Sequence, residues 1–379
     1  MSNLKVVHII PNLKMGGAER LCLDIIQALK DEGVSVLLVL LEDKIEHDVD
    51  LDGIEVFHTS ARSIINPFKK HSSEYIKFKE KVLNFKPDIV HTHLFEAEML
   101  WKSTMFNIPT IFHIHDNIKV FSPFEKGISK KNSWFKFLEK KYYLTLLKKQ
   151  TTKFLCISKD TERYIKSKFK GDCTILLHNA IKVKKFINNN KSDLNVISLI
   201  SIGSLVENKG HLFLIDVVNE LIKLTDRKVQ LSILGDGYKK EEILNKIKTK
   251  KLGSAIRLLG KVKNPEVDLS LSDFYIHGAF EESFGLVLIE AMAAGLPVFT
   301  TDGRGNRDLI IQGENGMIYK KRDAVKIAED ILSVANNPKK YDCMSKFCVE
   351  YSKKFDIQEY VIKLIKFYKN EISKNNFSN

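Results

Sequence analysis

Short apolar runs alternate with longer amphipathic segments along nearly all of the 379 residues. This alternation is typical of α/β proteins in which helices cover a parallel sheet. It predicts helices between the strands, for example over residues 18–30 and 74–85. The predicted strands are residues 4–10, 34–40, 54–58, 88–92, 110–113, 154–157 and 174–177 in the first half, and 196–202, 229–234, 255–259, 274–276, 297–300 and 317–319 in the second.

The best candidate for a linker is the polar segment KVKKFINNNKSDLN over residues 182–195. A stretch rich in Asn and Lys without apolar periodicity predicts a linker. It divides the chain into an N-terminal domain, 1–185, and a C-terminal domain, 196–356, each long enough to form its own core. We therefore expect two lobes with a cleft between them. A last helix, predicted over residues 357–372, could pack on either lobe.

Composition places the chain among soluble globular proteins, with 44% hydrophobic and 28% charged residues. The apolar run 36–41 is too short to cross a bilayer, and the start of the chain has no secretory signal pattern. Five scattered cysteines without paired spacing indicate reduced thiols rather than a disulfide or zinc framework. These features predict a cytoplasmic protein.

The net charge of +13 is concentrated in residues 121–185, which contain 17 Lys or Arg against 5 Asp or Glu. Such a patch suits a phosphorylated ligand, a lipid headgroup or nucleic acid. Only eight of the 60 basic residues are Arg, which disfavours nucleic acid. Aromatic residues alternate with lysines over 133–149, and this supports the hypothesis of peripheral binding to an anionic membrane. The alternative is an ordinary solvated lysine surface.

Gly16 and Gly17, in KMGGAER, lie where the first strand leads into a helix. Glycines there allow a close approach of a ligand, and a helix N-terminus presents free N–H groups to an anion. The segment is not a G-x-G-x-x-G motif, so no dinucleotide cofactor is expected. A purely structural turn is the alternative.

Two histidine motifs end neighbouring strands, HTH at 91–93 and HIHD at 113–116. Strand alternation places the two histidines of each motif on one face. Four histidines could bind a metal, but no HExxH or similar metal-binding spacing is present, so we expect no metal. Ligands bind at the carboxyl edge of a parallel sheet, and we expect at least one of these histidines to contact a ligand.

The segment EESFGLVLIEAMAAGLPV, residues 281–298, carries two glutamates with seven residues between them, Glu282 and Glu290. Ser283 is predicted to cap a helix over 286–294, and Gly295 to end it. The N-terminus of that helix would bind a diphosphate, while the two carboxylates accept hydrogen bonds from ribose and sugar hydroxyls. Lys209, in GSLVENKGH before another helix, adds a positive charge suited to phosphate.

Together these motifs resemble the family 4 glycosyltransferases, the large group 1 family of GT-B enzymes. The matching segments occur in the family's order and cover about residues 16–320. They are GGAER, PDIVHTH, HIHD, CISKD, HNAI, GSLVENKGH, ILGDG, LGKV, the two-glutamate segment, TDGRGNRDLI and NGMIY.

The resemblance implies an α/β GT-B fold, in which two Rossmann-like domains face each other across a cleft. The N-terminal domain would bind mainly the acceptor and the C-terminal domain the nucleotide-sugar, with the C-terminal helix, 357–379, packing back on the first domain. The implied catalytic residues are His115 and Glu282. The implied donor-binding residues are Gly16, Gly17, Ser204, Lys209, Val262, Ser283, Phe284, Gly285, Leu286, Val287 and Glu290.

One position departs from the family, which usually has an arginine where this chain has Ser204. A hydroxyl can donate a hydrogen bond but has no charge. Either Lys209 acts with helix dipoles alone, or Arg304 or Arg307 supplies the second charge.

The implied function is transfer of a sugar, with retention of anomeric configuration, from a nucleotide-sugar to a glycan or lipid-linked acceptor in bacterial-type surface polysaccharide or glycoconjugate assembly. A UDP-sugar is favoured over a GDP-sugar, and no cofactor or metal is expected. Two alternatives remain: a non-hydrolysing nucleotide-sugar 2-epimerase of the same fold, and an inactive sugar- or lipid-binding partner subunit. Donor turnover distinguishes them.

Overall fold

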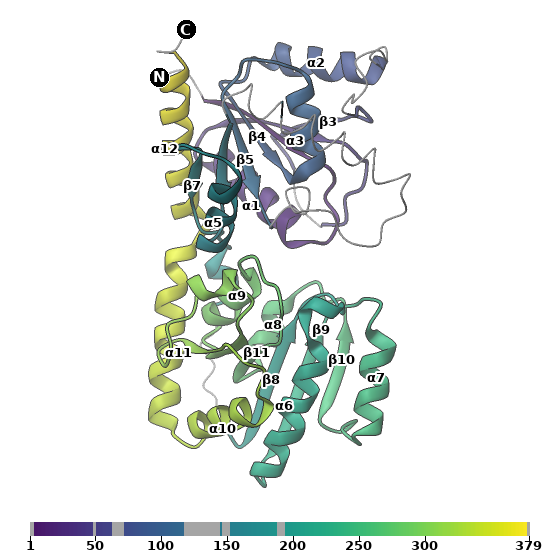
Figure 1. Ribbon diagram of the computed structural model, residues 1–379, viewed down its shortest axis with the longest axis vertical. Coiled ribbons are helices and arrows are strands. Elements are labelled where there is room, and N and C mark those ends of the chain that lie inside the picture. Colours follow the sequence, from purple (N-terminus) through teal and green to yellow (C-terminus); the bar gives the residue numbers. More distant parts are fainter. Residues whose placement is uncertain are drawn as a thin grey trace. The chain divides into compact units, whose positions relative to one another are not determined.

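The computed structural model describes residues 4–47, 51–62, 72–116, 145, 152–187 and 194–376 (Figure 1). The chain forms two compact units, of which the first comprises Met1–Asn179 with Ile357–Asn379 and the second Ala180–Asp356. Much of the basic segment 121–185 lies outside the described residues. Within the described part of the chain, no helix is both long enough and apolar enough to cross a membrane.

The first unit is built on a seven-stranded parallel sheet in the order β3-β2-β1-β4-β5-β6-β7. Its helices are α1 (Gly17–Asp31), α2 (Ser73–Phe85), α3 (Leu94–Ser103), α5 (Lys159–Lys168) and α12 (Ile357–Asn376). Its strands are β1 (Lys5–Ile10), β2 (Ser35–Leu40), β3 (Glu55–His58), β4 (Ile89–His93), β5 (Thr110–Ile114), β6 (Thr152–Cys156) and β7 (Thr174–Leu176).

The C-terminal helix α12 packs against α1 in this first unit (Figure 1). Its buried side chains, Tyr360, Val361, Leu364 and Tyr368, form one apolar stripe at helical spacing. This stripe follows the helix for more than two turns. Its burial explains why residues 357–379 form part of the first unit although they follow the second in sequence.

The second unit contains a six-stranded parallel sheet in the order β10-β9-β8-β11-β12-β13. Its strands are β8 (Val196–Ile202), β9 (Lys228–Leu234), β10 (Ile256–Gly260), β11 (Phe274–His277), β12 (Val298–Thr301) and β13 (Gly316–Tyr319). Its helices are α6 (His211–Leu224), α7 (Lys240–Thr249), α8 (Pro265–Ser270), α9 (Leu286–Ala293), α10 (Ala324–Ala335) and α11 (Pro338–Ser352).

The thirteen predicted strands are all present, with ends displaced by at most two residues. The unit boundary differs from the predicted one, because residues 180–185 belong to the second unit rather than the first. The Ile181 N–H donates to the Phe355 carbonyl at 2.9 Å, and Ile181 forms a parallel bridge with Asp356. Backbone pairing therefore fixes this stretch, which the sequence presents as a polar linker.

Both sheets reverse their strand order at one point, between β1 and β4 in the first unit and between β8 and β11 in the second. Crevices that bind ligands form at the carboxyl ends of the strands on either side of such a reversal. The loops after β1, β4 and β8 and after β11 are therefore the places where functional residues are expected.

Candidate functional site

In the second unit the loops after β8 and β11 come together at the point where the strand order reverses. Gly210, with φ of 66°, follows Lys209 at this approach. A Cβ atom on Gly210 would lie 1.9 Å from the Gly278 carbonyl oxygen, so only glycine allows the two backbones to pass. This close approach brings the side chain of Lys209 to the residues that follow β11.

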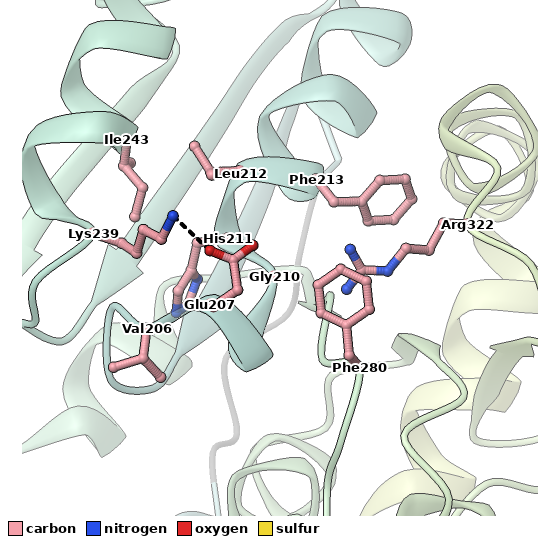
Figure 2. Close-up of a pocket in the computed structure, with 10 residues that line it drawn as sticks. All are labelled: Val206, Glu207, Gly210, His211, Leu212, Phe213, Lys239, Ile243, Phe280 and Arg322. Atoms are coloured by element: carbon pink, nitrogen blue, oxygen red, sulfur yellow. Dashed lines mark ion pairs between the residues drawn. The ribbon is translucent and has the colours of Figure 1, made fainter. Parts of the chain in front are cut away.

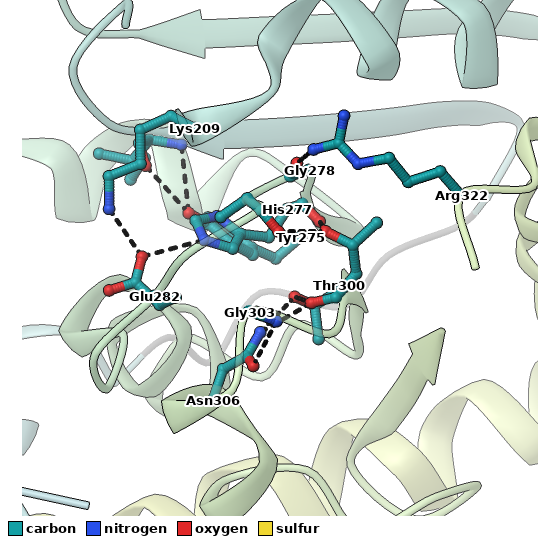
Figure 3. A network of polar contacts seen from close by, with 12 residues as sticks. Lys209, Tyr275, His277, Gly278, Glu282, Thr300, Gly303, Asn306 and Arg322 are labelled. Atoms are coloured by element: carbon teal, nitrogen blue, oxygen red, sulfur yellow. Dashed lines mark hydrogen bonds and ion pairs between the residues drawn. The ribbon is translucent and has the colours of Figure 1, made fainter. Parts of the chain in front are cut away.

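Lys209, His277 and Glu282 form the polar centre of this site (Figure 3). The Lys209 Nζ lies 2.7 Å from Glu282 Oε2, and the His277 Nε2 lies 3.1 Å from the same oxygen. The Glu282 side chain is only 11% exposed and that of His277 only 2%. Two donors thus hold one carboxylate oxygen in a largely buried position.

The protein keeps Glu282 ionised. Burial alone would raise its pKa, but the hydrogen bond from His277 and the positive charge of Lys209 outweigh burial and lower the pKa to about 2. At neutral pH the group is therefore a hydrogen-bond acceptor and not an acid. In the described part of the chain, no hydrogen bond reaches its other oxygen, Oε1, which remains available to a ligand.

The loop after β12 supports Glu282 through its backbone. The Glu282 N–H donates to the Gly303 carbonyl at 2.8 Å, and the Gly305 N–H donates to the Glu282 carbonyl at 2.9 Å. A Cβ atom on Gly305 would lie 1.9 Å from the Ser283 carbonyl oxygen, so the loop packs directly on this segment. The buried Asn306 fixes the loop, because its Oδ1 accepts from the Gly303 N–H and its Nδ2 donates to Thr301 (Figure 3).

Arg304 occupies the turn between those two backbone contacts, opposite Glu282 in a parallel bridge. Its φ of 81° and ψ of −70° match the rare, strained γ-turn conformation. The Arg304 side chain is exposed, and no hydrogen bond or ion pair reaches its guanidinium among the described residues. By contrast, the Arg307 Nε donates to both carboxylate oxygens of Asp302, at 2.7 and 2.8 Å. Of the two candidate cations, Arg304 is therefore the one available beside Glu282.

Helix α9 begins at Leu286, and Gly285, with φ of 98°, is its N-cap. The predicted cap at Ser283 is wrong, because the left-handed turn at Gly285 places Ser283 outside the helix and no side chain caps it. Phe284 is buried, whereas Leu286 and Val287 are partly exposed at the helix start. The first turn of α9 thus retains backbone N–H groups that suit an anion.

Glu290 projects from the middle of α9 and is only 4% exposed. The buried Tyr275 lies near it; the Tyr275 hydroxyl bonds to the backbone of Ile202, and its pKa is raised by burial and, to a smaller extent, by the charges of Glu282 and Glu290. Both carboxylates therefore lie close enough to Tyr275 to disfavour its ionisation. Ser204 is exposed after β8, and Val262 lies, partly exposed, in the loop after β10.

A small pocket opens next to this cluster, lined by the beginnings of α6 and α7 and by the loops after β11 and β13 (Figure 2). Arg322 donates to the Gly278 carbonyl and lies over the ring of Phe280, and burial lowers its pKa to about 10. The position of the Arg322 guanidinium is thus fixed by contacts within the protein. The pocket is lined by Val206, Glu207, Gly210, His211, Leu212, Phe213, Lys239, Ile243, Phe280 and Arg322.

In the first unit Gly16 is the N-cap of α1 and Gly17 its first residue. His115 follows β5 and belongs to a cluster of five histidines that extends over β1, β4 and β5. His8, His91, His93 and His113 are fully buried. Burial lowers the pKa of His8 and of His115 to about 3 and keeps the pKa values of the other three well below the usual range. All five imidazoles are therefore neutral at pH 7.

Two overlapping triads of this cluster have ring nitrogens close enough to surround a metal ion, within 4.8 Å of one another. They are His8, His91 and His93, and His93, His113 and His115. Sequence analysis missed His8 and Tyr368 in this cluster and His277 beside Glu282. A histidine inside an otherwise apolar strand, as in KVVHII and FYIH, was the available signal.

Two family models match the chain almost end to end: Glycosyltransferase Family 4 over residues 15–185 and Glycosyl transferases group 1 over residues 182–355. The chain belongs to this family of glycosyltransferases. The crystal structure of Anabaena HepE in complex with UDP and glucose superposes with a TM-score of 0.78 at 18% identity, covering 97% of this chain and all of that one. The fold is therefore GT-B.

Curated relatives cover most of the chain. An N-acetylgalactosamine-N,N'-diacetylbacillosaminyl-diphospho-undecaprenol 4-alpha-N-acetylgalactosaminyltransferase from Campylobacter jejuni is 28% identical over 82% of this chain and 84% of its own length. The alpha-monoglucosyldiacylglycerol synthase of Acholeplasma laidlawii is 24% identical over 98% of this chain and 94% of its own length. WaaG, a glycosyltransferase involved in lipopolysaccharide biosynthesis, has a TM-score of 0.70 at 16% identity, covering 96% and 99% of the two chains.

Proposed function

We propose that this glycosyltransferase transfers a sugar from a nucleotide-sugar, a UDP-sugar in preference to a GDP-sugar, to a glycan or lipid-linked acceptor, with retention of anomeric configuration. The observation that carries the proposal is the ionised Glu282, held through one oxygen by Lys209 and His277 beside the start of α9. A carboxylate fixed in this way can accept a hydrogen bond from a sugar hydroxyl while cations and helix amides face the adjoining diphosphate.

Each part of the donor has a corresponding group in the second unit. The amides at the start of α9 and the charges of Lys209 and Arg304 bind the diphosphate, and Glu290 accepts from the ribose hydroxyls. The backbone at Val262 contacts the base. Arg304 supplies the positive charge that Ser204 lacks, because Arg307 is already paired with Asp302. Structural neighbours that were crystallised with UDP, such as Anabaena HepE, support a uridine donor.

Catalysis rests on stabilising the departing diphosphate. Negative charge accumulates on that group in the transition state, and preorganised donors at such a place supply the largest catalytic contribution in many enzymes. Glu282 is ionised and its Oε2 is already occupied, so it orients the sugar and does not protonate the leaving group. Front-face attack, with the diphosphate accepting the acceptor's proton, gives the retained configuration. No metal is needed in this scheme.

The acceptor is proposed to be attached to a lipid. Among the relatives, the Campylobacter jejuni enzyme is named for a diphospho-undecaprenol and the Acholeplasma laidlawii enzyme for a diacylglycerol. The basic segment 121–185 would bring the first unit to an anionic membrane surface, where each lysine near the surface adds about 1 kcal/mol. Sedimentation with anionic and neutral vesicles, at low and high salt, tests this proposal. Equal sedimentation with both kinds of vesicle would reject it.

A panel of nucleotide-sugars tests the donor. A donor at 100 times its Kd stabilises the protein by about 2.7 kcal/mol, which a thermal-shift assay detects. We expect a UDP-sugar to give the largest shift, to be consumed only when a lipid-linked or glycan acceptor is added, and to yield a product with the donor's anomeric configuration by NMR. Turnover should persist in EDTA.

Other outcomes of the same assay would overturn the proposal. Conversion of a UDP-sugar to its 2-epimer without an acceptor would indicate an epimerase. Binding without turnover of any donor would indicate a partner subunit. Loss of turnover in EDTA, with recovery on addition of manganese or magnesium, would overturn the metal-free scheme.

A further inference from the structure

The five histidines form a continuous stack in the first unit, in which four are fully buried and His115 is partly exposed. They lie on one face of three adjacent strands, because His8 is in register with His91 and His93 is in register with His113. Ring centroids of neighbouring members are 4.1 to 5.4 Å apart. A stack of this kind in a dry core must satisfy ten ring nitrogens with few other polar groups nearby.

The contacts within the stack form a chain that ends at His115. The His8 Nδ1 lies 3.0 Å from His93 Nε2, and the His93 Nδ1 lies 3.1 Å from His115 Nε2. At the other end, the Tyr368 hydroxyl of α12 lies 2.6 Å from His91 Nδ1 and 3.4 Å from His8 Nε2. In the described part of the chain, no hydrogen bond reaches His91 Nε2.

A neutral imidazole has one N–H and one lone pair, so each histidine in the chain donates from one nitrogen and accepts at the other. Three arrangements satisfy every link, and in one of them the Tyr368 oxygen accepts from both His91 and His8, which leaves the buried Tyr368 O–H without an acceptor. The other two differ in the direction of every bond. In the first, the proton is on Nδ1 of each histidine, and His91 Nε2 is left as an unused lone pair. In the second, every bond is reversed, and His91 Nε2 is left as a buried N–H without an acceptor. Buried N–H groups without partners are the rarer case in proteins, which favours the first arrangement.

We infer that His8, His93 and His115 form a hydrogen-bonded chain of single polarity that fixes His115 with its proton on Nδ1. The His93 Nδ1–H donates to His115 Nε2, so the second nitrogen of His115 can only donate. No hydrogen bond among the described residues occupies that Nδ1. His8 and His93 are positioning residues for His115. At the other end of this series of hydrogen bonds, His8 contacts the hydroxyl of Tyr368 on the C-terminal helix α12.

The consequence for chemistry rests on the proposed function. If a donor or acceptor sugar reaches His115, it meets an N–H donor, which binds the oxygen of a hydroxyl and cannot accept that hydroxyl's proton. His115 is therefore a binding group and not a general base. The low pKa values of its neighbours agree, since none of them offers a charge that would be passed along the chain.

The test needs no substrate. Two-bond 1H–15N NMR of the full chain, labelled with 15N-histidine, shows which ring nitrogen carries each proton, and a His115→Gln variant assigns the His115 signal. We expect the Nδ1–H form for His8, His93 and His115 at pH 7.5. An Nε2–H signal for His115, a doubly protonated ring, or the nitrogen shifts and bound metal expected of a zinc site would overturn the inference.

Variants at His93 provide the matched comparison. His93→Asn keeps an N–H donor near the position of Nδ1, whereas His93→Leu removes it. In the Leu variant we expect both the Nδ1–H and the Nε2–H form of His115 to appear and sugar transfer to fall about tenfold. The Asn variant should keep the single Nδ1–H form and at least a third of the activity. Equal spectra for the two variants would overturn the inference. A protein that shows the Nδ1–H form but turns over no nucleotide-sugar supports the chain and rejects the proposed function.

Discussion

The Lys209 Nζ lies 2.7 Å from Glu282 Oε2, so the phosphate-binding lysine expected from the sequence is paired with the sugar-binding carboxylate. The Lys209 side chain is 26% exposed and can still face a second anion. Under the proposed function the pair would join the two halves of the donor, with the carboxylate on the sugar and the ammonium between it and the diphosphate.

Replacing Lys209 by Ala should reduce turnover more than it weakens donor binding, because negative charge grows on the diphosphate only in the transition state. We expect kcat to fall by about 100-fold, the usual effect of losing one preorganised donor. Steady-state kinetics with the best donor measures this effect. Lys326→Ala, which breaks an exposed ion pair with Asp330 on α10, is the control and should leave kcat unchanged. A raised donor KM with unaltered kcat would contradict the assignment.

His277 should act through Glu282. Leu at this position removes the N–H that holds Oε2, whereas Gln can still donate from a similar distance. A hydrogen bond to a charged group contributes about 1.5–3 kcal/mol, so His277→Leu should lower kcat/KM by roughly 10- to 100-fold. His277→Gln should restore most of that loss. Equal losses in both variants would mean that His277 only fills space.

Glu290 should determine affinity for the nucleotide. Its replacement by Gln removes a charge-assisted hydrogen bond to the ribose and should raise donor KM by about 10- to 100-fold while kcat changes little. Glu329→Gln, on the exposed face of α10, is a control of the same chemistry. Titration with the nucleoside diphosphate alone measures binding directly. An unchanged Kd in Glu290→Gln would refute the ribose contact.

The strand pattern predicted the fold because apolar strands of a parallel sheet, such as SVLLVL in β2, are distinct from the helices between them. The cap of α9 was misassigned, because local propensity favours Ser283 while the positive φ of Gly285 becomes visible only in three dimensions. The resemblance singled out Glu282 and Lys209, but their contact depends on the passage of Gly210 beside Gly278. His8 and Tyr368 are 360 residues apart, and no local pattern connects them.

Arg304 is expected to be the second diphosphate cation. Arg304→Ala should lower kcat/KM for the donor by at least about tenfold, the effect of one charged hydrogen bond. Arg307→Ala should affect the donor much less, because the Arg307 guanidinium is already bound to Asp302. Comparable losses in the two variants would indicate that the loop, rather than the Arg304 charge, matters.

Replacing Arg304 by Gly distinguishes the effect of losing the Arg304 charge from the effect of the backbone strain at this turn. A side chain at φ 81° costs on the order of 1 kcal/mol or more, which glycine does not incur. Arg304→Gly should therefore be more stable than Arg304→Ala in thermal unfolding and equally impaired in turnover. If Arg304→Gly were the less stable variant, the strain at this turn would be disproved.

Mild acid should destabilise the protein through the five clustered histidines. Their pKa values are lower in the folded protein than the ordinary 6.5, because burial disfavours the charged ring. Below pH 6.5 the unfolded chain therefore binds more protons than the folded one, and stability falls as the pH falls. Glu282 does not contribute in this range, because its lowered pKa stabilises the fold above about pH 4.5 and that contribution is lost only toward pH 2.

The expected slope can be measured. Each proton taken up on unfolding changes the free energy of unfolding by about 1.4 kcal/mol per pH unit, so five histidines give a slope approaching about 7 kcal/mol per pH unit between pH 6 and 5. Urea unfolding at half-unit steps from pH 7.5 to 5 determines this slope. His8→Asn should reduce it by about one proton, and Lys326→Ala, outside the cluster on α10, should leave it unaltered. A slope below one proton in the unmodified protein would show that the cluster is hydrated or charged rather than dry and neutral.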